Sequence, residues 1–363
     1  MSRLLLTTDC VGGVWRYSVD LGHALSARGW TVGLAAIGPS PSDDQRAEAE
    51  GLGLLVTGAP LDWEPGGEGG LLAGRAALEE AAHAFGADCV QLNQPAFGGP
   101  DWNLPVVAVA HSCVATWWRA VKGEAPPEEW AWHGQAMRRG LASADAALAP
   151  SAAFAAALSS AYPDIRQAEV VHNGTPLPPA AQLRTDRTDH ILSAGRLWDE
   201  AKDLRTLDAA ARGLGWPVTI AGSSEDPEGR RRAYPSLHPL GFLGQDEMRE
   251  RHARAAAFVS TSLYEPFGLA VLEAAGYGTP LVLSDIPTFR ELWEGAAMFC
   301  PPRDDAALSH ALDRLMSDPD LKARLGARAR ERAARYTLSR CADAMEAVYA
   351  RYCSVPAARQ GVA

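Results

Sequence analysis

The chain has 363 residues, which exceeds the size at which a single hydrophobic core usually stops growing, so two domains are expected. Its composition, 47% hydrophobic and 21% charged, is typical of globular proteins, and the absence of a run of about 18 apolar residues predicts no transmembrane helix. The net charge of −10 is concentrated in residues 1–180, where 10 Lys and Arg face 19 Asp and Glu, and this argues against nucleic acid or an anionic membrane as partner.

The first half begins with a pattern of buried strands and glycine loops. Residues 3–9 (RLLLTTD) form an apolar run that ends in polar residues, and Gly12-Gly13 and a helical pattern follow. A second apolar run, TVGLAAI, lies at 31–37. This order of strand, glycine loop, helix and strand predicts a parallel α/β sheet. Further candidate strands, each ending in polar residues, lie at 89–93, 106–112, 145–151 and 168–174.

The same pattern restarts after a segment rich in Pro and Ala at 175–189, which we interpret as a linker. Apolar runs that alternate with helical stretches lie at 190–197, 218–222, 256–262 and 280–285, and residues 318–353 favour closing helices. We therefore expect an α/β protein with two Rossmann-like, doubly wound domains that face each other across a cleft. The expected boundaries are 1–178 for the first domain, 179–340 for the second, and 341–363 for a closing C-terminal helix that can pack back on the first domain.

Cysteine usage and the N-terminal residues bear on the compartment. The six cysteines are scattered without a C-x-x-C pair, so we expect free thiols rather than a disulfide framework or a zinc site. The first residues, MSRLLLTTD, contain only three leucines before polar residues, which is short for the apolar region of a signal peptide. A cytoplasmic location is the resulting expectation. The cysteines are Cys10, Cys89, Cys113, Cys300, Cys341 and Cys353.

Two cations follow the first strand of the second half. In AGRLWDEAKDL (194–204), the strand ends at Gly195, and Arg196 and Lys202 lie in the loop that follows. Arginine can bind a diphosphate bidentately and lysine adds a point charge, so this loop suits a diphosphate. The alternative is a pair of ordinary surface cations at a junction between strand and helix.

Two glutamates flank a glycine corner in YEPFGLAVLEAA (264–275). Gly268 precedes a helical pattern, so the N–H groups of Gly268 and Leu269 are free to bind an anion at the helix N-terminus. Glu265 lies in the preceding loop and Glu273 lies about one turn inside the helix, so both are within reach of one cleft. Carboxylates of this kind accept hydrogen bonds from the hydroxyls of a ribose or another sugar. The alternative is that Glu265 caps the helix and Glu273 is merely exposed on it.

These motifs together resemble the retaining glycosyltransferases of family 4, which have the GT-B fold. The resemblance rests on GRLWDEAKDL, VTIAGSSED, LGFLG and YEPFGLAVLEAAGYGTPLVLSDIPTFREL in this order, and in the first half on TDCVGGVWRYSVDLGHALSARGWTV, AHS and APS…VHNG. It covers the second half densely and the first half through separate motifs.

The resemblance implies a role for each matching residue. Arg196 and Lys202 bind the diphosphate, Gly268 and Leu269 add backbone N–H bonds, Glu265 binds the donor sugar, and Glu273 binds the ribose. The loop around Phe242, Leu243 and Gly244 meets the base, and Gly13 approaches the phosphates from the first half. The implied donor-binding set is Gly13, Arg196, Lys202, Phe242, Leu243, Glu265, Phe267, Gly268, Leu269 and Glu273. The implied catalytic set is His111, Arg196, Lys202 and Glu265.

His111 and a tryptophan-rich stretch are the candidates for the first half. His111 ends the run VVAVAHS; such a histidine is often structural, whereas the family places one there against the donor sugar. In CVATWWRAVKGEAPPEEWAWHGQ, we predict that Trp117, Trp118, Glu128 and Trp130 bind the acceptor. The alternative is packing of these aromatic rings in the core or between domains.

The expected reaction is retaining transfer of a hexose-type sugar from a nucleotide diphosphate sugar, with UDP favoured, to a hydroxyl of a soluble, saccharide-containing acceptor. No metal-ligand pattern and no cofactor motif is apparent, so the cations and the helix N-terminus are expected to replace a metal ion. The alternatives are a GDP- or ADP-sugar-dependent transferase of polysaccharide synthesis and a catalytically inactive sugar-nucleotide-binding relative. A sugar-nucleotide epimerase, a pyridoxal-phosphate-dependent phosphorylase, which needs a further lysine, and a secreted solute receptor fit less well.

Overall fold

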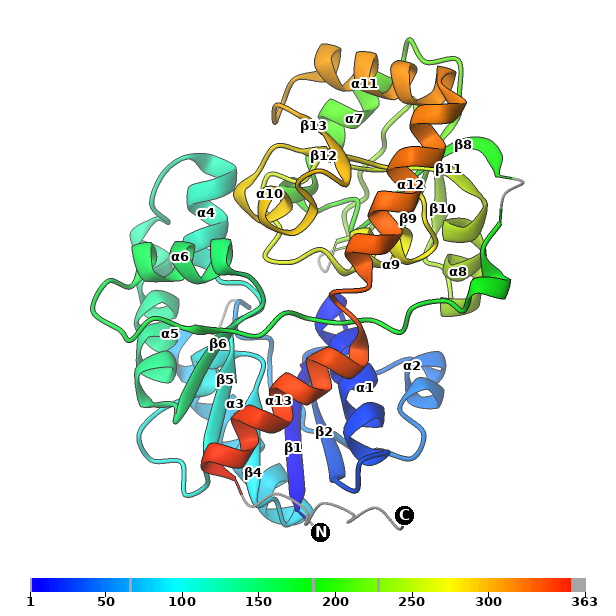
Figure 1. The fold of residues 1–363 in the computed structure, drawn as a ribbon. Helices are drawn as coiled ribbons and strands as arrows, with labels where there is room; N and C mark the ends of the chain where they lie inside the picture. Colours follow the sequence, from blue (N-terminus) through cyan, green and yellow to red (C-terminus); the bar gives the residue numbers. More distant parts are fainter. Residues whose placement is uncertain (1, 65–66, 185–186, 227–228, 354–363) are drawn as a thin grey trace, which may run out of the picture. The chain divides into compact units, whose positions relative to one another are not determined.

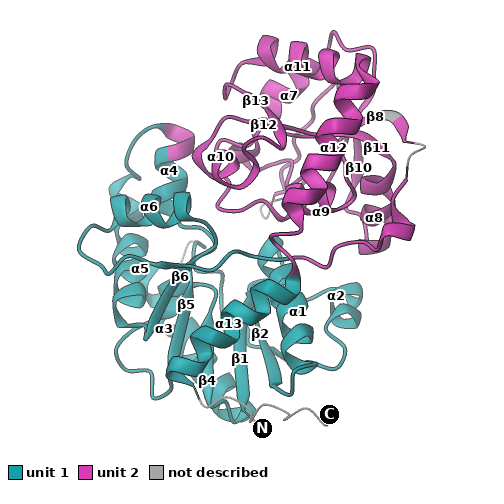
Figure 2. Cartoon of the chain, viewed as in Figure 1, with its two compact units in different colours: residues 1–119, 123–174, 338–363 teal, residues 120–122, 175–337 magenta. Residues whose placement is uncertain are grey.

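A computed structural model describes residues 2–64, 67–184, 187–226 and 229–353 of the chain. The chain divides into two compact units (Figure 2). The first unit contains residues 1–119, 123–174 and 338–363, and the second contains residues 120–122 and 175–337. The chain therefore leaves the first unit at residue 174, a few residues before the predicted boundary, and returns to it at 338. Residues 185–186 of the predicted linker and residues 354–363 of the predicted closing segment lie outside the described residues.

The first unit is built on a parallel sheet with the strand order β3-β2-β1-β4-β5-β6-β7 (Figure 1). The central strand β1 pairs with β2 along its whole length, from Arg3 opposite Thr31 to Asp9 opposite Ile37. Leu4, Leu5 and Leu6 are all fully buried, as expected for a strand covered on both faces. The strands are β1 (Arg3–Asp9), β2 (Thr31–Ile37), β3 (Gly53–Val56), β4 (Cys89–Leu92), β5 (Val106–Val109), β6 (Ala146–Ala149) and β7 (Glu169–Val170).

Helices join and cover these strands, and side chains cap several of them. The Ser151 hydroxyl accepts a hydrogen bond from the Phe154 N–H, which fixes the start of α6. The α-helices are α1 (Gly13–Ser26), α2 (Asp43–Glu48), α3 (Gly67–Phe85), α4 (Val114–Lys122), α5 (Ala131–Ser143), α6 (Ala152–Ala161) and α13 (Leu338–Tyr352). Short 3-10 turns are η1 (Pro95–Phe97) and η2 (Glu128–Trp130).

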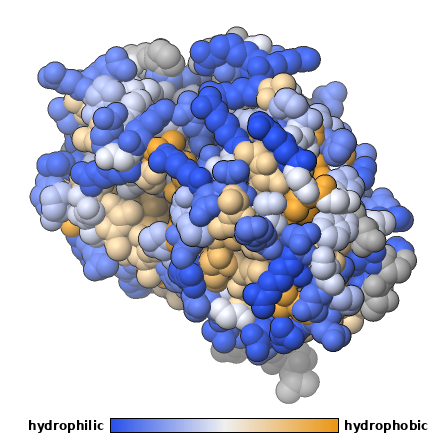
Figure 3. Space-filling view, turned by 90° about the horizontal axis from the view of Figure 1, so that it is seen from above, coloured by the Kyte–Doolittle hydropathy of each residue, from blue (hydrophilic) through white to orange (hydrophobic). Residues whose placement is uncertain are grey.

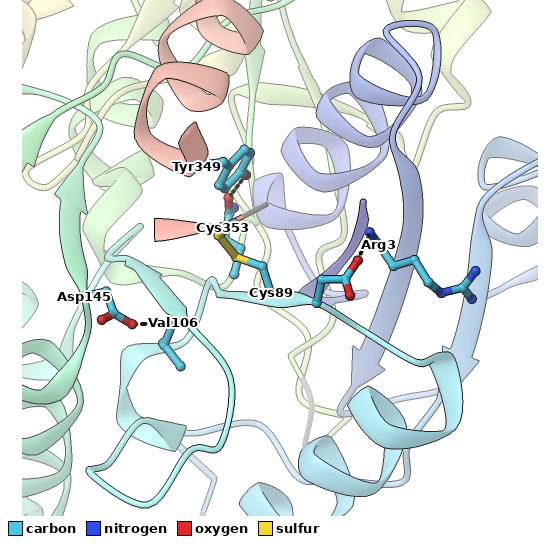
Figure 4. Close-up of a disulfide and its surroundings, with 8 residues drawn as sticks. Arg3, Cys89, Val106, Asp145, Tyr349 and Cys353 are labelled. Carbon is cyan, nitrogen blue, oxygen red and sulfur yellow. Dashed lines mark hydrogen bonds between the residues drawn. A yellow bond between two sulfur atoms is a disulfide. The ribbon is translucent and has the colours of Figure 1, made fainter. Parts of the chain in front are cut away.

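The last helix, α13, packs on the first unit through polar contacts and a disulfide. Glu346 accepts hydrogen bonds from Arg28 and from the indole N–H of Trp30, and Arg351 donates to Glu169 at 2.8 Å. Beyond them, Cys353 forms a disulfide with Cys89, the first residue of β4, with a Cα–Cα distance of 5.7 Å (Figure 4). The expectation of six free thiols is therefore wrong for these two cysteines. They are 264 residues apart, and only the return of the chain brings them together.

The second unit is built on a parallel sheet with the order β10-β9-β8-β11-β12-β13. Its central strands β8 and β11 are neighbours, so the loops that follow them leave the same edge of the sheet. The strands are β8 (Thr188–Ala194), β9 (Val218–Ala221), β10 (Leu237–Gly241), β11 (Ala255–Ser260), β12 (Leu281–Ser284) and β13 (Ala297–Cys300). The α-helices are α7 (Leu204–Ala211), α8 (Gln245–Arg254), α9 (Leu269–Gly276), α10 (Pro287–Trp293), α11 (Asp305–Ser317) and α12 (Pro319–Ala333), and the 3-10 turns are η3 (Ala180–Gln182) and η4 (Glu200–Lys202).

Each face of the second sheet carries its own buried cluster. Ile191 of β8 packs in a cluster with α7 and α11, whereas the next residue, Leu192, packs in a cluster with α9 and α10. This alternation follows from the two-residue period of a strand. The face shown in Figure 3 is mostly hydrophilic, and its apolar side chains lie in separate patches. None of the helices in the described parts of the chain combines the length and apolarity needed to cross a bilayer.

Candidate functional site

The loop after β8 holds the two predicted cations in different environments. Arg196 donates from Nη2 to Asp199 Oδ2 at 2.7 Å, and its guanidinium lies 5.2 Å from the centre of the Trp198 ring. The other oxygen of Asp199 accepts from the Ala201 N–H at 2.9 Å. Burial opposes ionisation of Asp199, but the charges of Arg196 and Lys202 outweigh it and keep the pKa of Asp199 below its ordinary value. Asp199 is thus an ionised anchor that orients Arg196.

Lys202 and Glu265 form an ion pair within the second unit. Lys202 donates from Nζ to Glu265 Oε2 at 2.6 Å, and both side chains are 19% exposed. The loops that carry them are tied by backbone contacts, because Leu263 N donates to Ala201 O at 2.7 Å and Thr261 Oγ1 donates to Lys202 O at 2.8 Å. An ammonium has three N–H donors, so Lys202 keeps donors for an anion while it holds Glu265.

The glycine corner forms the start of α9, as its position predicts. Gly268 is the N-cap residue in the left-handed region, with a φ of 92°, and no side chain caps the helix there. A Cβ at this position would lie 3.1 Å from the Phe289 ring and 3.3 Å from Glu265 Cγ, so the corner is close-packed as well as left-handed. The first turn contains no acidic residue. The N–H groups at this end therefore offer a compact anion site beside Glu265.

Glu273 lies inside α9 and contacts a different partner from the Lys202–Glu265 pair. Its carboxylate Oε2 lies 3.6 Å from Nε2 of His252, a residue that is only 1% exposed. Neither ring nitrogen of His252 has a hydrogen-bond partner among the described residues, and the ring is stacked on Tyr277 with centroids 6.3 Å apart. Glu273 itself is 29% exposed, so it retains a face for a ligand hydroxyl.

The remaining donor candidates of the second unit differ in exposure. Phe242, just after β10, is 76% exposed, an unusual state for a large apolar side chain, and Leu243 is half-buried. Phe267 is 3% exposed and its ring contacts Tyr336 edge to face, with centroids 5.8 Å apart. The side chain of Phe267 therefore belongs to the core, and only its backbone is available to a ligand.

In the first unit, His111 and Gly13 each follow a strand. His111 comes after β5, and its Nε2 lies 3.1 Å from Asn93 Oδ1. Its ring packs edge to face on Tyr17 with centroids 4.5 Å apart. The residue as a whole is half-buried, and burial lowers the pKa of His111 to about 3, so the ring is neutral at physiological pH. Gly13 is the exposed first residue of α1, where no side chain caps the helix.

Three of the predicted acceptor residues, Trp117, Trp118 and Trp130, form a row of aromatic rings with Trp132. We call these four residues the tryptophan cluster. Successive ring centroids lie 5.6, 6.5 and 6.0 Å apart. All four rings are half-buried, and Glu128 beside them is exposed. The indole N–H of Trp118 is buried and has no hydrogen-bond partner in the part of the chain that the structure describes. The cluster is thus neither fully inside a core nor fully exposed.

Sequence reasoning missed Asp199, which orients Arg196, and Asn93, which contacts His111. The signal for Asp199 was present, since a carboxylate three residues from an arginine in one loop can pair with it. A signal for Asn93 was also present, because Asn93 follows β4 and His111 follows β5, two strands that pair in the sheet and end at the same edge. Across the described residues, no group of three or more His, Cys, Asp or Glu side chains is arranged to hold a metal ion.

Both halves of the chain match known families. Residues 180–332 match the family described as glycosyl transferases group 1, and residues 11–177 match glycosyltransferase family 4. The chain is 33% identical to glycogen synthase of Mycobacterium tuberculosis (strain ATCC 25618 / H37Rv) over 186 residues, which are 47% of this chain and 45% of that protein. It is 34% identical to phosphatidyl-myo-inositol mannosyltransferase of Mycolicibacterium smegmatis over 160 residues, 41% and 42% of the two chains. The chain thus matches less than half the length of these relatives.

Solved structures are similar over nearly the whole chain. The TM-score is 0.76 with sucrose-phosphate synthase from Thermosynechococcus elongatus, at 21% identity over 97% of this chain and 99% of that one. It is 0.74 with HepE of Anabaena in complex with UDP and glucose, at 18% identity over 96% and 99%. These likenesses establish the fold, two Rossmann-like domains of the GT-B type, as the sequence predicts.

Proposed function

The chain belongs to glycosyltransferase family 4, and we propose that it transfers a hexose-type sugar from a nucleotide diphosphate sugar to an acceptor hydroxyl. The observation that carries the proposal is the Lys202–Glu265 pair of 2.6 Å beside the uncapped N-terminus of α9. A cation, free backbone N–H groups and a carboxylate in one place match a ligand that joins a phosphate to a sugar.

Each part of the donor has a matching group in the second unit. Lys202 and Arg196 bind the diphosphate, and the N–H groups of Gly268 and Leu269 bind its distal phosphate. Glu265 accepts hydrogen bonds from the sugar hydroxyls, and its pairing with Lys202 sets the sugar next to the phosphate. Glu273 takes the ribose hydroxyls, and the exposed ring of Phe242 supports stacking on the base. Gly13, at the N-terminus of α1, offers N–H groups that suit an anion within the first unit.

The reaction breaks the bond between the anomeric carbon and the phosphate oxygen and forms a bond from that carbon to the acceptor oxygen. The acceptor proton passes to the leaving phosphate on the same face, so the anomeric configuration is retained. Negative charge grows on the leaving diphosphate, and Lys202, Arg196 and the N-terminus of α9 stabilise it electrostatically. We propose that this cationic site makes a metal ion unnecessary, and that no other cofactor takes part.

We propose UDP as the nucleotide, with GDP and ADP as the alternatives that the same phosphate contacts would accept. HepE of Anabaena was solved with UDP and glucose, whereas one relative is a GDP-mannose-dependent mannosyltransferase, so both bases occur among similar proteins. The acceptor is proposed to be a soluble, saccharide-containing molecule, because the tryptophan cluster offers aromatic faces and Glu128 a hydrogen-bond acceptor. A cytoplasmic location is part of the proposal.

Product analysis tests this function. The purified chain is incubated with UDP-, GDP- and ADP-sugars and a panel of saccharides, with EDTA present, and the anomeric configuration of any product is read by NMR. We expect release of one nucleoside diphosphate and a product with the donor's configuration. Turnover that EDTA abolishes would contradict metal independence, and an inverted product would contradict the mechanism. Binding of a sugar nucleotide without any turnover would instead identify an inactive, binding-only relative.

A further inference from the structure

A chain of buried polar side chains connects the C-terminal helix to His111 within the first unit. Gln91, Asn93 and Tyr349 are 0%, 3% and 0% exposed. Gln91 lies two residues after Cys89 and Asn93 two residues after Gln91, so all three point to the same face of the β4 segment. In Figure 4, Tyr349 lies next to the Cys89–Cys353 disulfide. Buried polar groups are costly unless they are paired, so the partners of each atom can be followed one by one.

The orientation of the Asn93 amide is fixed by its surroundings. Its Nδ2 lies 2.6 Å from the Thr7 carbonyl oxygen and 3.0 Å from Ser18 Oγ. A carbonyl oxygen can only accept, so the nitrogen of the amide must face Thr7. The opposite atom, Oδ1, therefore faces Gln91 Nε2 at 2.8 Å and His111 Nε2 at 3.1 Å.

Gln91 is held in the matching orientation from the other side. Its Oε1 accepts a hydrogen bond from the Tyr349 hydroxyl, and its Nε2 donates to Asn93 and lies 3.3 Å from Tyr17 Oη. Burial raises the pKa of Tyr17 and of Tyr349 well above the ordinary value, so both hydroxyls keep their protons. The network contains neutral groups only, and donors and acceptors match along it from Tyr349 to Asn93.

This polarity determines the tautomer of His111. Because Asn93 Oδ1 can only accept, the ring nitrogen that faces it, Nε2, must carry the proton. In a neutral imidazole the other nitrogen then has a free lone pair. None of the residues that the structure describes hydrogen-bonds Nδ1 of His111. Burial, which lowers the pKa of His111 to about 3, keeps the ring in this neutral state.

We propose that Asn93, held by Gln91 and Tyr349, is the positioning residue that fixes His111 as the Nε2–H tautomer and leaves Nδ1 to accept a hydrogen bond from a sugar hydroxyl. This inference rests on the proposed function for its ligand. A lone-pair acceptor binds a hydroxyl and repels groups that only accept, such as phosphate or carboxylate oxygens. His111 therefore recognises the sugar rather than the diphosphate, and α13 contributes to the site without touching the substrate.

The tautomer is measured directly by NMR of the full chain labelled with 15N in its histidines. His111 is assigned by the signal that is lost in His111→Gln. We expect a pyrrole-type shift for Nε2 and a pyridine-type shift for Nδ1 from pH 5 to 8. A proton on Nδ1, or on both nitrogens, would overturn the inference, and this result needs no turnover. If no donor reacts at all, the proposed function fails while the NMR result still decides the tautomer.

Two further comparisons separate positioning from general stability. Asn93→Ala should let His111 exchange between tautomers and lower kcat at least tenfold with little change in donor KM, whereas Asn103→Ala in an exposed loop should change neither. If Asn93→Ala is folded and keeps the tautomer, Asn93 is not the positioning residue.

The second comparison uses donor sugars that each lack one hydroxyl. For the hydroxyl that contacts His111, its removal should lower kcat/KM of the wild type on the order of tenfold, the effect of one hydrogen bond, and should not lower kcat/KM of His111→Ala any further. Equal losses in both proteins, for every hydroxyl, would refute the hydroxyl contact.

Discussion

The candidate groups of the two units use opposite electrostatics. In the second unit, charged side chains pair with each other: Lys202 and Glu265 are each 19% exposed, and the 40% exposed Arg196 pairs with the buried Asp199. In the first unit, His111 is held by neutral amides and hydroxyls that are almost fully buried. The difference matches the chemistry proposed for each. A diphosphate needs cations, whereas a sugar hydroxyl needs an acceptor of fixed position, and an unpaired charge in the buried network would be costly.

The comparison also separates two kinds of vulnerability. A charged, partly exposed group contributes to ligand binding more than to folding, because exposed ion pairs stabilise a fold only weakly. A buried neutral network contributes to both, because each lost partner leaves a desolvated atom unpaired. Substitutions in the second unit should therefore change activity with little loss of stability, and those in the network should change both.

The largest effect is expected for Lys202→Ala. Loss of the cation that stabilises the leaving diphosphate should lower kcat by about 10²- to 10³-fold, the usual cost of one such donor. The melting temperature should stay close to that of the wild type. Steady-state kinetics and thermal unfolding check this, with Lys322→Ala as the matched control, since Lys322 donates a hydrogen bond to the Met316 carbonyl and has no proposed role in the site. A Lys202→Ala enzyme with wild-type kcat would contradict the proposal that Lys202 stabilises the leaving diphosphate.

The next largest effect is expected for the stability of Tyr349→Phe. It removes one hydroxyl and leaves the buried Gln91 Oε1 without its donor, which should cost about 1–3 kcal/mol in the free energy of unfolding. Urea unfolding measures this. Tyr352→Phe, on the same helix, is the control and should stay within about 0.5 kcal/mol of the wild type. If the two variants are equally stable, the buried network does not stabilise the unit.

Replacing Trp117 and Trp118 together with Ala should raise the acceptor KM by about tenfold, because aromatic contacts of this kind contribute about 0.5–1.5 kcal/mol each. Hydrolysis of the donor should remain. The Phe variants keep an aromatic face and should restore most of the affinity. If donor hydrolysis falls as much as transfer does, the tryptophan cluster is structural and the acceptor binds elsewhere.

The smallest effect concerns the exposed pair that links α13 to β7. The hydrogen bond from Arg351 holds the pKa of Glu169 below its ordinary value of 4.5, so its stabilisation is present above that pH and is lost as pH falls. Glu169→Gln should cost about 0.2–1 kcal/mol at pH 7, and the difference should vanish in acid. Unfolding at both pH values and hydrogen exchange of α13 measure it. Asp164→Asn, which breaks an exposed pair with Arg138 of α5, should leave the exchange of α13 unchanged.

The strands that sequence reasoning found and missed differ in burial. The central strands were predicted within a few residues, because fully buried parallel strands appear as continuous apolar runs. The missed strands β3, β10 and β13 all lie at sheet edges, and each contains exposed or half-buried positions. An edge strand buries less surface, so its residues carry a weaker apolar pattern.

The site was predictable where its residues are close in sequence or follow neighbouring strands. Lys202 and Glu265 follow β8 and β11, which pair in the sheet, so their meeting follows from the topology. The contact between Gln91 and Tyr349 in the network around His111 was not predictable. The two residues are 258 positions apart, and the sequence around a buried glutamine does not indicate which residue it will contact. The same holds for Cys89 and Cys353, which only the return of α13 brings together.

The most direct test of the central claim, a diphosphate site in the second unit, is thermal unfolding of the wild type and of Lys202→Ala with UDP, GDP or ADP. A nucleotide at about a hundredfold excess over its Kd should add about 2.7 kcal/mol of stability, a shift of a few degrees. We predict that one nucleotide, UDP, stabilises the wild type and that Lys202→Ala loses most of the shift. If no nucleotide shifts the wild type, or if the variant shifts equally, the site formed by Lys202, Glu265 and the start of α9 does not bind a diphosphate.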